Sequence, residues 1–447
     1  MMPWTLRETA ALVNGKILGG AADLKVTGVC HDTRDVQRGF LFAAIRGARF
    51  DGHRFLGKAK QGGAAAALVA RKIRGTGIPQ ILVADTTRAL GELGRAQRLQ
   101  WGGPVVAVTG SVGKTTVKDM TAHLLGGRYR TLKTRGNLNN QFGLPLTLLK
   151  LTKDHQAAVV ELGINHPGEM DWLSEIARPD TAVVTAIGEA HLGFFTGKRQ
   201  LAEEKLKITS RLREKGAVVL NADDAYLRKS FKNKKTFGLV HGEVRAQSLR
   251  RLGMKTQFTL WAEGRAFRTV LAMAGDHNVQ NALAASAAAM TLGVSAKECA
   301  DRLRTFQMQA PMRMELKRQG GVLFINDAYN ASPTSMVAAL SAFARITVKG
   351  HRIAVLGDML ELGDFALPAH AQILRLALNE ELDGLVLVGE LMGEALDRTA
   401  VRKDLRVWHF PTASLAGKFL RRKLEKGDAV LLKGSRGMKL EKVLEVF

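Results

Sequence analysis

A glycine-rich segment between an apolar run and a helix-like run is the part of this chain best suited to chemistry. It reads Thr109-Gly110-Ser111-Val112-Gly113-Lys114-Thr115-Thr116, after the apolar run 105–108 and before the helix-like run 117–125. Glycines let backbone N–H groups approach an anion, and the start of a helix attracts negative charge. We predict a site for nucleotide phosphates, where Lys114 reaches the outer phosphates and the Thr115 hydroxyl binds Mg²⁺. The loop is a shortened form of the usual pattern, whose first glycine would fall at Val108.

Three further side chains could serve such a site. Glu161 ends the apolar run 157–161, where a carboxylate could bind Mg²⁺ or simply form a helix cap or a salt bridge. His191 follows another apolar run, but imidazole is an unusual Mg²⁺ ligand, so its position alone fits a structural residue equally well. Lys205 lies in a charged helical segment, where a lysine is usually solvated.

Elements that repeat in the order strand, helix must position these residues. Continuous apolar runs separated by helical patterns are typical of a parallel sheet covered on both faces. Strands are predicted at 105–108, 157–161, 182–187 and 217–220, and a helix-rich stretch at 278–292. A later unit has predicted strands at 323–326, 352–356, 384–388 and 429–432, and helices at 335–344, 368–379 and 414–424. The first part of the chain has predicted strands at 26–29, 40–43 and 81–83, and helices at 6–13, 53–61 and 86–99.

The pattern predicts an α/β protein of three domains. Residues 1–83 form a small N-terminal α/β domain, and residues 84–310 form a central domain with a doubly wound, mostly parallel sheet that carries the phosphate loop. Residues 311–447 form a Rossmann-like α/β domain.

The composition is that of an ordinary globular protein, apart from its charge. The chain has 447 residues, 46% of them hydrophobic and 24% charged, no apolar run near the ~20 residues of a membrane span, and a charged start without a signal-peptide core. We expect a cytoplasmic protein without a membrane span. Its two cysteines, Cys30 and Cys299, fit no metal or disulfide spacing. The net charge of +25 raises the possibility of nucleic-acid binding, but the basic residues are scattered and no recognition motif accompanies them, so no nucleic-acid partner is expected.

Several blocks, in order along nearly the whole chain, resemble the Mur ligases, the ATP-dependent amide-forming family of bacterial peptidoglycan synthesis. They are the segments 109–116, 136–140 (Gly-Asn-Leu-Asn-Asn), 161–163, 190–192 (Ala-His-Leu), 221–224, 276–283 and 434–436. The blocks 326–336 (Asn-Asp-Ala-Tyr-Asn-Ala-Ser-Pro-Thr-Ser-Met) and 357–363 (Gly-Asp-Met-Leu-Glu-Leu-Gly) are most similar to the member that joins D-alanyl-D-alanine to UDP-N-acetylmuramoyl-tripeptide. The N-terminal blocks 32–36, 39–42 and 51–53 are similar to the UDP-binding domain of that member.

The resemblance implies roles for individual residues. Thr115, Glu161 and His191 would serve two Mg²⁺ sites, and Lys205 would be carbamylated to N6-carboxylysine, an anion that can bind or orient a metal. The catalytic set would be Lys114, His191 and Lys205. The ATP-binding set would be the loop residues Thr109, Gly110, Ser111, Val112, Gly113, Lys114, Thr115 and Thr116, with Asn278, Asn281, Arg313 and Asp327. The substrate-binding set would be Thr33, Arg34, Asn139, Tyr329 and Asn330.

Some positions depart from the family pattern or have a second explanation. Val112 replaces a frequent asparagine, which should be tolerated because the backbone N–H binds the phosphate. Asp276 replaces the usual basic pattern and could weaken nucleotide contacts. Leu206-Lys207 replaces a frequent Gly-Glu after the lysine that would be carbamylated. Asn278 and Asn281 could instead cap a helix.

The implied activity is amide ligation through an acyl phosphate, with ATP, Mg²⁺, UDP-N-acetylmuramoyl-tripeptide and D-alanyl-D-alanine, by a monomer. Three alternatives remain open: another Mur-type or folate-polyglutamate ligase, a nucleic-acid-stimulated NTPase suggested by the charge, and a pseudoenzyme or scaffold. The intact set of Lys114, Thr115, Glu161, His191 and Lys205 argues against the last.

Overall fold

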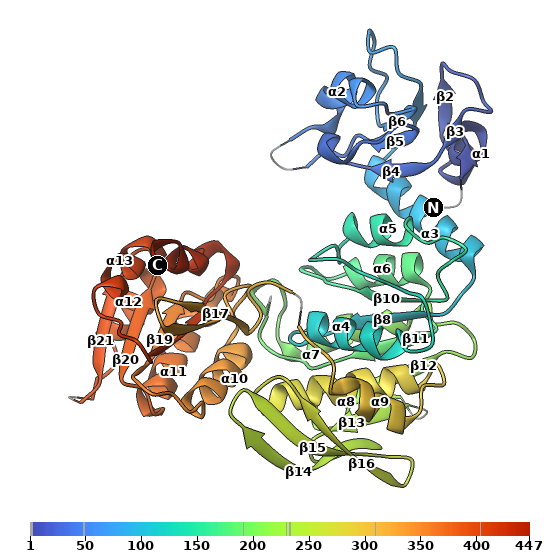
Figure 1. Ribbon diagram of the computed structural model, residues 1–447. Helices are drawn as coiled ribbons and strands as arrows, with labels where there is room; N and C mark the ends of the chain where they lie inside the picture. Colours follow the sequence, from blue (N-terminus) through green and yellow to red (C-terminus); the bar gives the residue numbers. More distant parts are fainter. Residues whose placement is uncertain are drawn as a thin grey trace.

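The chain folds into three α/β units that follow one another along the sequence (Figure 1). The computed structural model describes residues 3–47, 50–190, 192–228, 230–231, 234–308, 310–402 and 404–447. Within these residues no helix combines the length and the apolar character needed to cross a membrane.

In its described residues, the N-terminal unit has a five-stranded sheet with the order β2-β7-β6-β5-β4, beside a small β1-β3 ribbon. The strands are β1 (Trp4–Thr5), β2 (Lys16–Leu18), β3 (Lys25–Val26), β4 (Gly28–Cys30), β5 (Phe40–Ala43), β6 (Ala66–Val69) and β7 (Gln80–Leu82). The helices are α1 (Leu6–Leu12) and α2 (Leu56–Gln61), with α3 (Thr86–Trp101) leading into the central unit. The predicted strand 26–29 was wrong as a single element, because β3 pairs with β1 while β4 joins the larger sheet.

The central unit has a nine-stranded sheet with the order β16-β15-β14-β13-β12-β11-β8-β10-β9 in the described residues. Its first strands are β8 (Val105–Thr109), β9 (Thr131–Lys133), β10 (Ala157–Glu161), β11 (Thr181–Val184) and β12 (Ala217–Asn221), all parallel. The side chains of β8 alternate between two hydrophobic cores, one on each face of the sheet. On one face, Val106 and Val108 pack with α4 (Lys114–Leu125), α8 (Asp276–Met290) and α9 (Ala296–Leu303). Val105 and Ala107 pack with α5 (Gly143–Leu148), α6 (Glu169–Ala177) and α7 (Lys198–Leu206). Burial on both faces explains the uninterrupted apolar runs.

An extension of this sheet was not predicted from the sequence. It comprises β13 (Lys235–Gly238), β14 (Val244–Leu252), β15 (Lys255–Ala262) and β16 (Arg265–Leu271). The last three pair antiparallel, and β15 alternates strictly between buried and partly exposed residues along most of its length. One face of β15 is buried, and much of β14 and β16 is exposed, so these strands lack the apolar runs by which the other strands were found.

The C-terminal unit has a six-stranded sheet with the order β17-β18-β22-β19-β20-β21 in the described residues. The strands are β17 (Glu315–Gln319), β18 (Val322–Asn326), β19 (Arg352–Gly357), β20 (Gly384–Val388), β21 (Arg406–Phe410) and β22 (Ala429–Lys433). All but β17 run parallel. Helices α10 (Pro333–Ala344), α11 (Ala366–Asn379) and α12 (Glu390–Asp397) pack on one face, and α13 (Ala413–Arg421) packs on the other. The predicted fold class is confirmed, whereas the prediction for this unit lacked β17, β21 and α12. The predictions for the other two units lacked, among others, β2, β6, β9, α5, α6 and α9.

Candidate functional site

The phosphate loop lies between β8 and α4 and depends on two glycines. Gly110 has φ +147°, and a Cβ there would lie 1.9 Å from the Thr185 hydroxyl oxygen. Gly113 has φ +82°, and a Cβ there would lie 2.3 Å from the Asn281 side-chain oxygen. Gly113 is also the N-cap of α4 and supplies no capping side chain, which leaves the first N–H groups of the helix for another acceptor. The loop therefore has the geometry of an anion site at a helix N-terminus.

Lys114 folds over this loop. Its Nζ donates to the carbonyl oxygens of Gly110 at 2.7 Å and Ser111 at 3.2 Å. Burial lowers the pKa of the Lys114 ammonium; the Glu161 carboxylate opposes this shift and the Arg313 guanidinium adds to it. Two cations from different units thus lie near one another beside the helix N-terminus, an arrangement that suits a ligand with several negative charges.

Glu161 ends β10, next to β8 in the sheet. One carboxylate oxygen accepts a hydrogen bond from the Thr115 hydroxyl at 2.9 Å, and the other accepts one from the Asn139 amide at 2.8 Å. The residue is 2% exposed and forms no ion pair with any residue that the structure describes. A buried carboxylate with only neutral donors, beside a hydroxyl, fits the oxygen ligands that Mg²⁺ prefers. The described residues contain no group of three or more His, Cys, Asp or Glu side chains able to hold a metal, and His191 lies outside them.

Lys205 lies on α7 and is 1% exposed. Its ammonium forms no hydrogen bond or ion pair with another described residue. Burial, followed by repulsion from Lys114, holds the pKa of Lys205 well below its ordinary value, and Glu204 opposes the shift. A lowered pKa favours the unprotonated amine, which is the form that reacts with CO₂. The local sequence alone would suggest a solvated lysine, but α7 packs this face inward.

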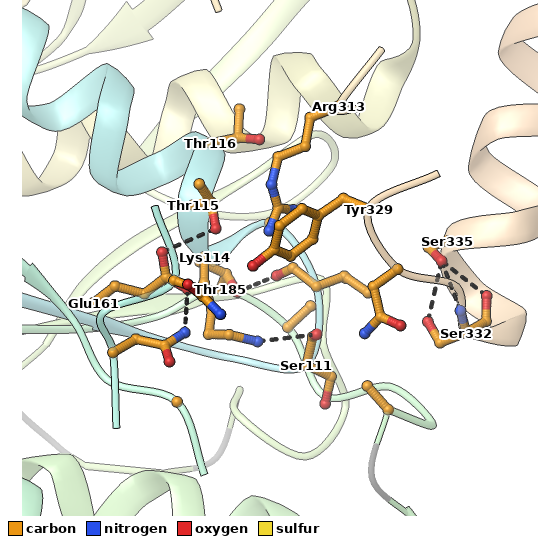
Figure 2. A pocket seen from close by; sticks show the side chains of 18 of the residues that line it. Ser111, Lys114, Thr115, Thr116, Glu161, Thr185, Arg313, Tyr329, Ser332 and Ser335 are labelled. Carbon is orange, nitrogen blue, oxygen red and sulfur yellow. Dashed lines mark hydrogen bonds between the residues drawn. The ribbon is translucent and has the colours of Figure 1, made fainter. Parts of the chain in front are cut away.

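The C-terminal unit forms the opposite wall of the site (Figure 2). The Arg313 guanidinium stacks over the Tyr329 ring, 4.0 Å from its centroid, and both side chains point toward Lys114 and Thr115. Asp327 pairs with Lys433 at 2.8 Å, and Lys433 also donates to the carbonyl oxygen of Asn330 at 2.7 Å. Lys433 therefore fixes the segment that carries Asp327, Tyr329 and Asn330. It was not among the predicted site residues, although its place at the end of an apolar strand, directly before the 434–436 block, was a usable signal.

Asn278 and Asn281 of α8 line the same cleft, and the Asn281 side chain lies beside Gly113 of the phosphate loop. Asn278 is buried, and its amide donates to the Ala274 carbonyl oxygen at 2.7 Å, while Asn281 donates to Asn278 at 3.5 Å. Neither residue caps the helix, because its N-cap is Gly275. Asp276 pairs with Arg251 at 2.6 Å, so its carboxylate is neutralised within the central unit.

These groups line one cleft of about 1270 Å³ between the central and C-terminal units. Of the predicted residues, those lining it are Ser111, Val112, Gly113, Lys114, Thr115, Thr116, Asn139, Glu161, Asn278, Asn281, Arg313, Asp327, Tyr329 and Asn330. Lys205 is not among the lining residues. The cleft continues to Phe142, His166 and Trp172, which were missed because single aromatic residues in helices and loops carry no sequence signal.

Thr33 and Arg34 lie away from this cleft, in the N-terminal unit. They belong to a short 3₁₀ helix whose N-cap is Asp32. Arg34 is exposed and pairs with Asp32, which helps to lower the pKa of Asp32 to about 2. The structure does not bring them together with the other predicted residues.

The chain matches three family profiles in succession. They are the Mur ligase family catalytic domain over residues 25–98, the Mur ligase middle domain over 108–289, and the Mur ligase glutamate ligase domain over 312–436. The chain belongs to the Mur ligase family. Mur ligases are ATP-dependent enzymes that form carbon–nitrogen bonds and use Mg²⁺, and this chain is a ligase of that kind.

Named relatives of this Mur ligase span its whole length. The UDP-N-acetylmuramoyl-tripeptide–D-alanyl-D-alanine ligase of Bacillus subtilis is 37% identical, covering 100% of this chain and 98% of the relative. The enzyme of the same name from Escherichia coli is 35% identical, covering 99% and 98%. The crystal structure of MurF from Acinetobacter baumannii superposes with a TM-score of 0.91 at 34% identity, covering 100% and 98%. MurF from Thermotoga maritima, in complex with ADP, superposes with a TM-score of 0.82 at 31% identity, covering 94% and 96%.

Proposed function

We propose that this Mur ligase joins D-alanyl-D-alanine to UDP-N-acetylmuramoyl-tripeptide, with conversion of ATP to ADP and phosphate. The observation that carries the proposal is similarity along the whole chain, at 37% and 35% identity, to two ligases named for that reaction. The cleft supports it, because the phosphate loop and the 327–330 segment lie on facing walls.

The first chemical step activates a carboxylate. A terminal carboxylate oxygen of the tripeptide attacks the γ-phosphorus of ATP. The bond between that phosphorus and the bridging oxygen breaks, so ADP is released and the tripeptide becomes an acyl phosphate. Lys114, the N–H groups at the start of α4 and Arg313 would neutralise the phosphate oxygens, and their proximity in the cleft supports this. Asn278 and Asn281 would bind the nucleotide from α8, and Asp327, held by Lys433, from the facing wall.

Mg²⁺ fits the oxygen ligands beside the loop. Thr115 and Glu161 would hold one ion, and His191 with a carbamylated Lys205 would complete a second site; bound Mg²⁺ supplies positive charge to the phosphates. The burial of Lys205 and its lowered pKa support carbamylation, since the amine attacks CO₂ only when unprotonated.

The second step forms the amide. The dipeptide amine attacks the acyl carbon and loses a proton, and phosphate leaves with the electrons of the carbon–oxygen bond. Tyr329 and Asn330 on the C-terminal wall and Asn139 on the central wall would contact the peptide substrates. Thr33 and Arg34 would bind the UDP end from the N-terminal domain.

We further propose that the enzyme is a cytoplasmic monomer with domains at 1–83, 84–310 and 311–447, and without a nucleic-acid partner. The excess of lysine and arginine would give the enzyme a positive electrostatic field that attracts its anionic substrates.

Phosphate release tests the function. Purified protein is supplied with ATP, Mg²⁺, UDP-N-acetylmuramoyl-tripeptide and D-alanyl-D-alanine, and each component is omitted in turn. Release that requires both substrates, with a pentapeptide product by mass spectrometry, is expected. Release that needs neither and is stimulated by DNA or RNA would identify an NTPase instead.

A further inference from the structure

A buried lysine on the phosphate-loop helix has no part in the reaction described above. Lys118 lies one turn after Lys114 on α4 and is 2% exposed. Its Nζ donates to the Thr134 carbonyl oxygen at 2.9 Å and pairs with Asp119 at 3.0 Å. A buried ammonium is costly to desolvate, so these bonds must compensate that cost.

Thr134 connects this lysine to the metal-site carboxylate. It directly follows β9 and is fully buried. Its Oγ1 accepts a hydrogen bond from the Glu161 backbone N–H at 3.0 Å, and its own N–H donates to the Val159 carbonyl oxygen at 3.1 Å. Thr134 thus ties the end of β9 to the end of β10, where Glu161 sits.

The segment that follows Thr134 makes a second contact with Glu161. Residues 135–139 lead from Thr134 to Asn139, and the Asn139 side-chain amide donates a hydrogen bond to one Glu161 carboxylate oxygen at 2.8 Å. The Asn139 carbonyl oxygen also accepts from the Gly163 N–H at 2.8 Å. The Thr115 hydroxyl on α4 donates a hydrogen bond to the other Glu161 carboxylate oxygen at 2.9 Å. The contacts therefore form a closed ring, which runs from Lys118 on α4 through Thr134, Asn139 and Glu161 and returns to α4 at Thr115.

We propose that Lys118 is a positioning residue for metal binding: by holding the Thr134 carbonyl, it fixes the segment that orients Glu161. The inference rests on the proposed function, in which Glu161 binds Mg²⁺. Groups that orient a metal ligand typically change metal affinity by about 10- to 100-fold when removed.

Lys133 provides a matched control. It pairs with the same Asp119 carboxylate oxygen at 2.7 Å, and it lies one residue before Thr134. The variants Lys118→Met and Lys133→Met each remove one positive charge and one Asp119 partner. Only the first removes a bond to the Thr134 carbonyl oxygen.

The test measures Mn²⁺ binding to the enzyme–ADP complex by electron paramagnetic resonance, with ADP affinity in EDTA measured by calorimetry. Lys118→Met should weaken Mn²⁺ binding at least about 10-fold and leave ADP affinity in EDTA unchanged. Lys133→Met should bind Mn²⁺ as the wild type does. Equal Mn²⁺ affinity in Lys118→Met and wild type, or equal losses in the two variants, would overturn the inference.

If Lys118→Met does not fold, Lys118→Gln replaces it, because glutamine keeps a polar group at this buried position but is too short to reach the Thr134 carbonyl oxygen, and the same selective loss is expected. If the wild type itself binds no Mn²⁺ with ADP, the proposed nucleotide and metal site is wrong. Retained wild-type binding with unaffected variants rejects only the role of Lys118.

Discussion

The contact between the central and C-terminal domains yields a prediction about domain closure. Thr334, at the start of α10, donates its hydroxyl and its N–H to one Glu189 carboxylate oxygen, the N–H at 3.3 Å. The other oxygen pairs with Lys198 at 2.5 Å, so the carboxylate is held in place. A second contact joins the Gly193 N–H to the Glu361 carbonyl oxygen at 3.4 Å. These bonds hold the wall that carries Arg313 and Tyr329 against the phosphate loop.

The variant Thr334→Val keeps the side-chain shape and removes the hydroxyl donor. A hydrogen bond to a charged group contributes about 1.5–3 kcal/mol. The Glu189 side chain is 23% exposed and Thr334 is exposed, so we take the lower end, about 1.5 kcal/mol. We call the enzyme closed when this contact between the central and C-terminal domains is made, and open when it is broken. The ratio of closed to open enzyme should then fall about tenfold.

Single-molecule energy transfer measures that ratio. Dyes on Lys297→Cys in the central domain and Arg398→Cys in the C-terminal domain report their separation; both side chains are exposed, at 72% and 61%, and the native cysteines are buried. Thr334→Ser retains the hydroxyl and should behave as the wild type. If the valine and serine variants show the same closed fraction, the Glu189–Thr334 bond does not control closure.

Four other outcomes are expected. Lys114→Ala should abolish ATP-dependent phosphate release, and near-normal rates would contradict the proposed role of the loop. Lys205→Ala should lose activity that bicarbonate or a small carboxylate partly restores; unaffected activity would exclude a functional carbamate. Arg98 is 1% exposed and donates to the carbonyl oxygens of Ala177 and Arg178 and to Asp180, so Arg98→Met should lower the free energy of unfolding by about 3 kcal/mol in urea titrations. Arg199→Met, which breaks an exposed pair, should change it by less than about 1 kcal/mol.

Much of the fold could be predicted because the strands of a sheet buried on both faces are continuously apolar. That signal located β8, β10, β12, β18, β19, β20 and β22 to within a residue or two at either end. It failed for β14 to β16, where Arg245, Arg250 and Arg268 lie in strands with one exposed face. Such strands are stabilised by pairing with neighbours, which local sequence does not display.

The sequence by itself determined the glycine loop before α4, since the conformation of Gly110 and Gly113 is a matter of local backbone geometry. It also placed Glu161 at a strand end. The tertiary structure alone decided which distant groups meet there. Lys433, at the end of β22, forms an ion pair with Asp327, which follows the neighbouring strand β18. Asn139 donates a hydrogen bond to Glu161 from another loop. Packing removes Lys205 from water, and this burial lowers the pKa of its ammonium. The physical reason is that burial, and hence pKa and hydrogen-bond partners, depend on elements far apart in the chain.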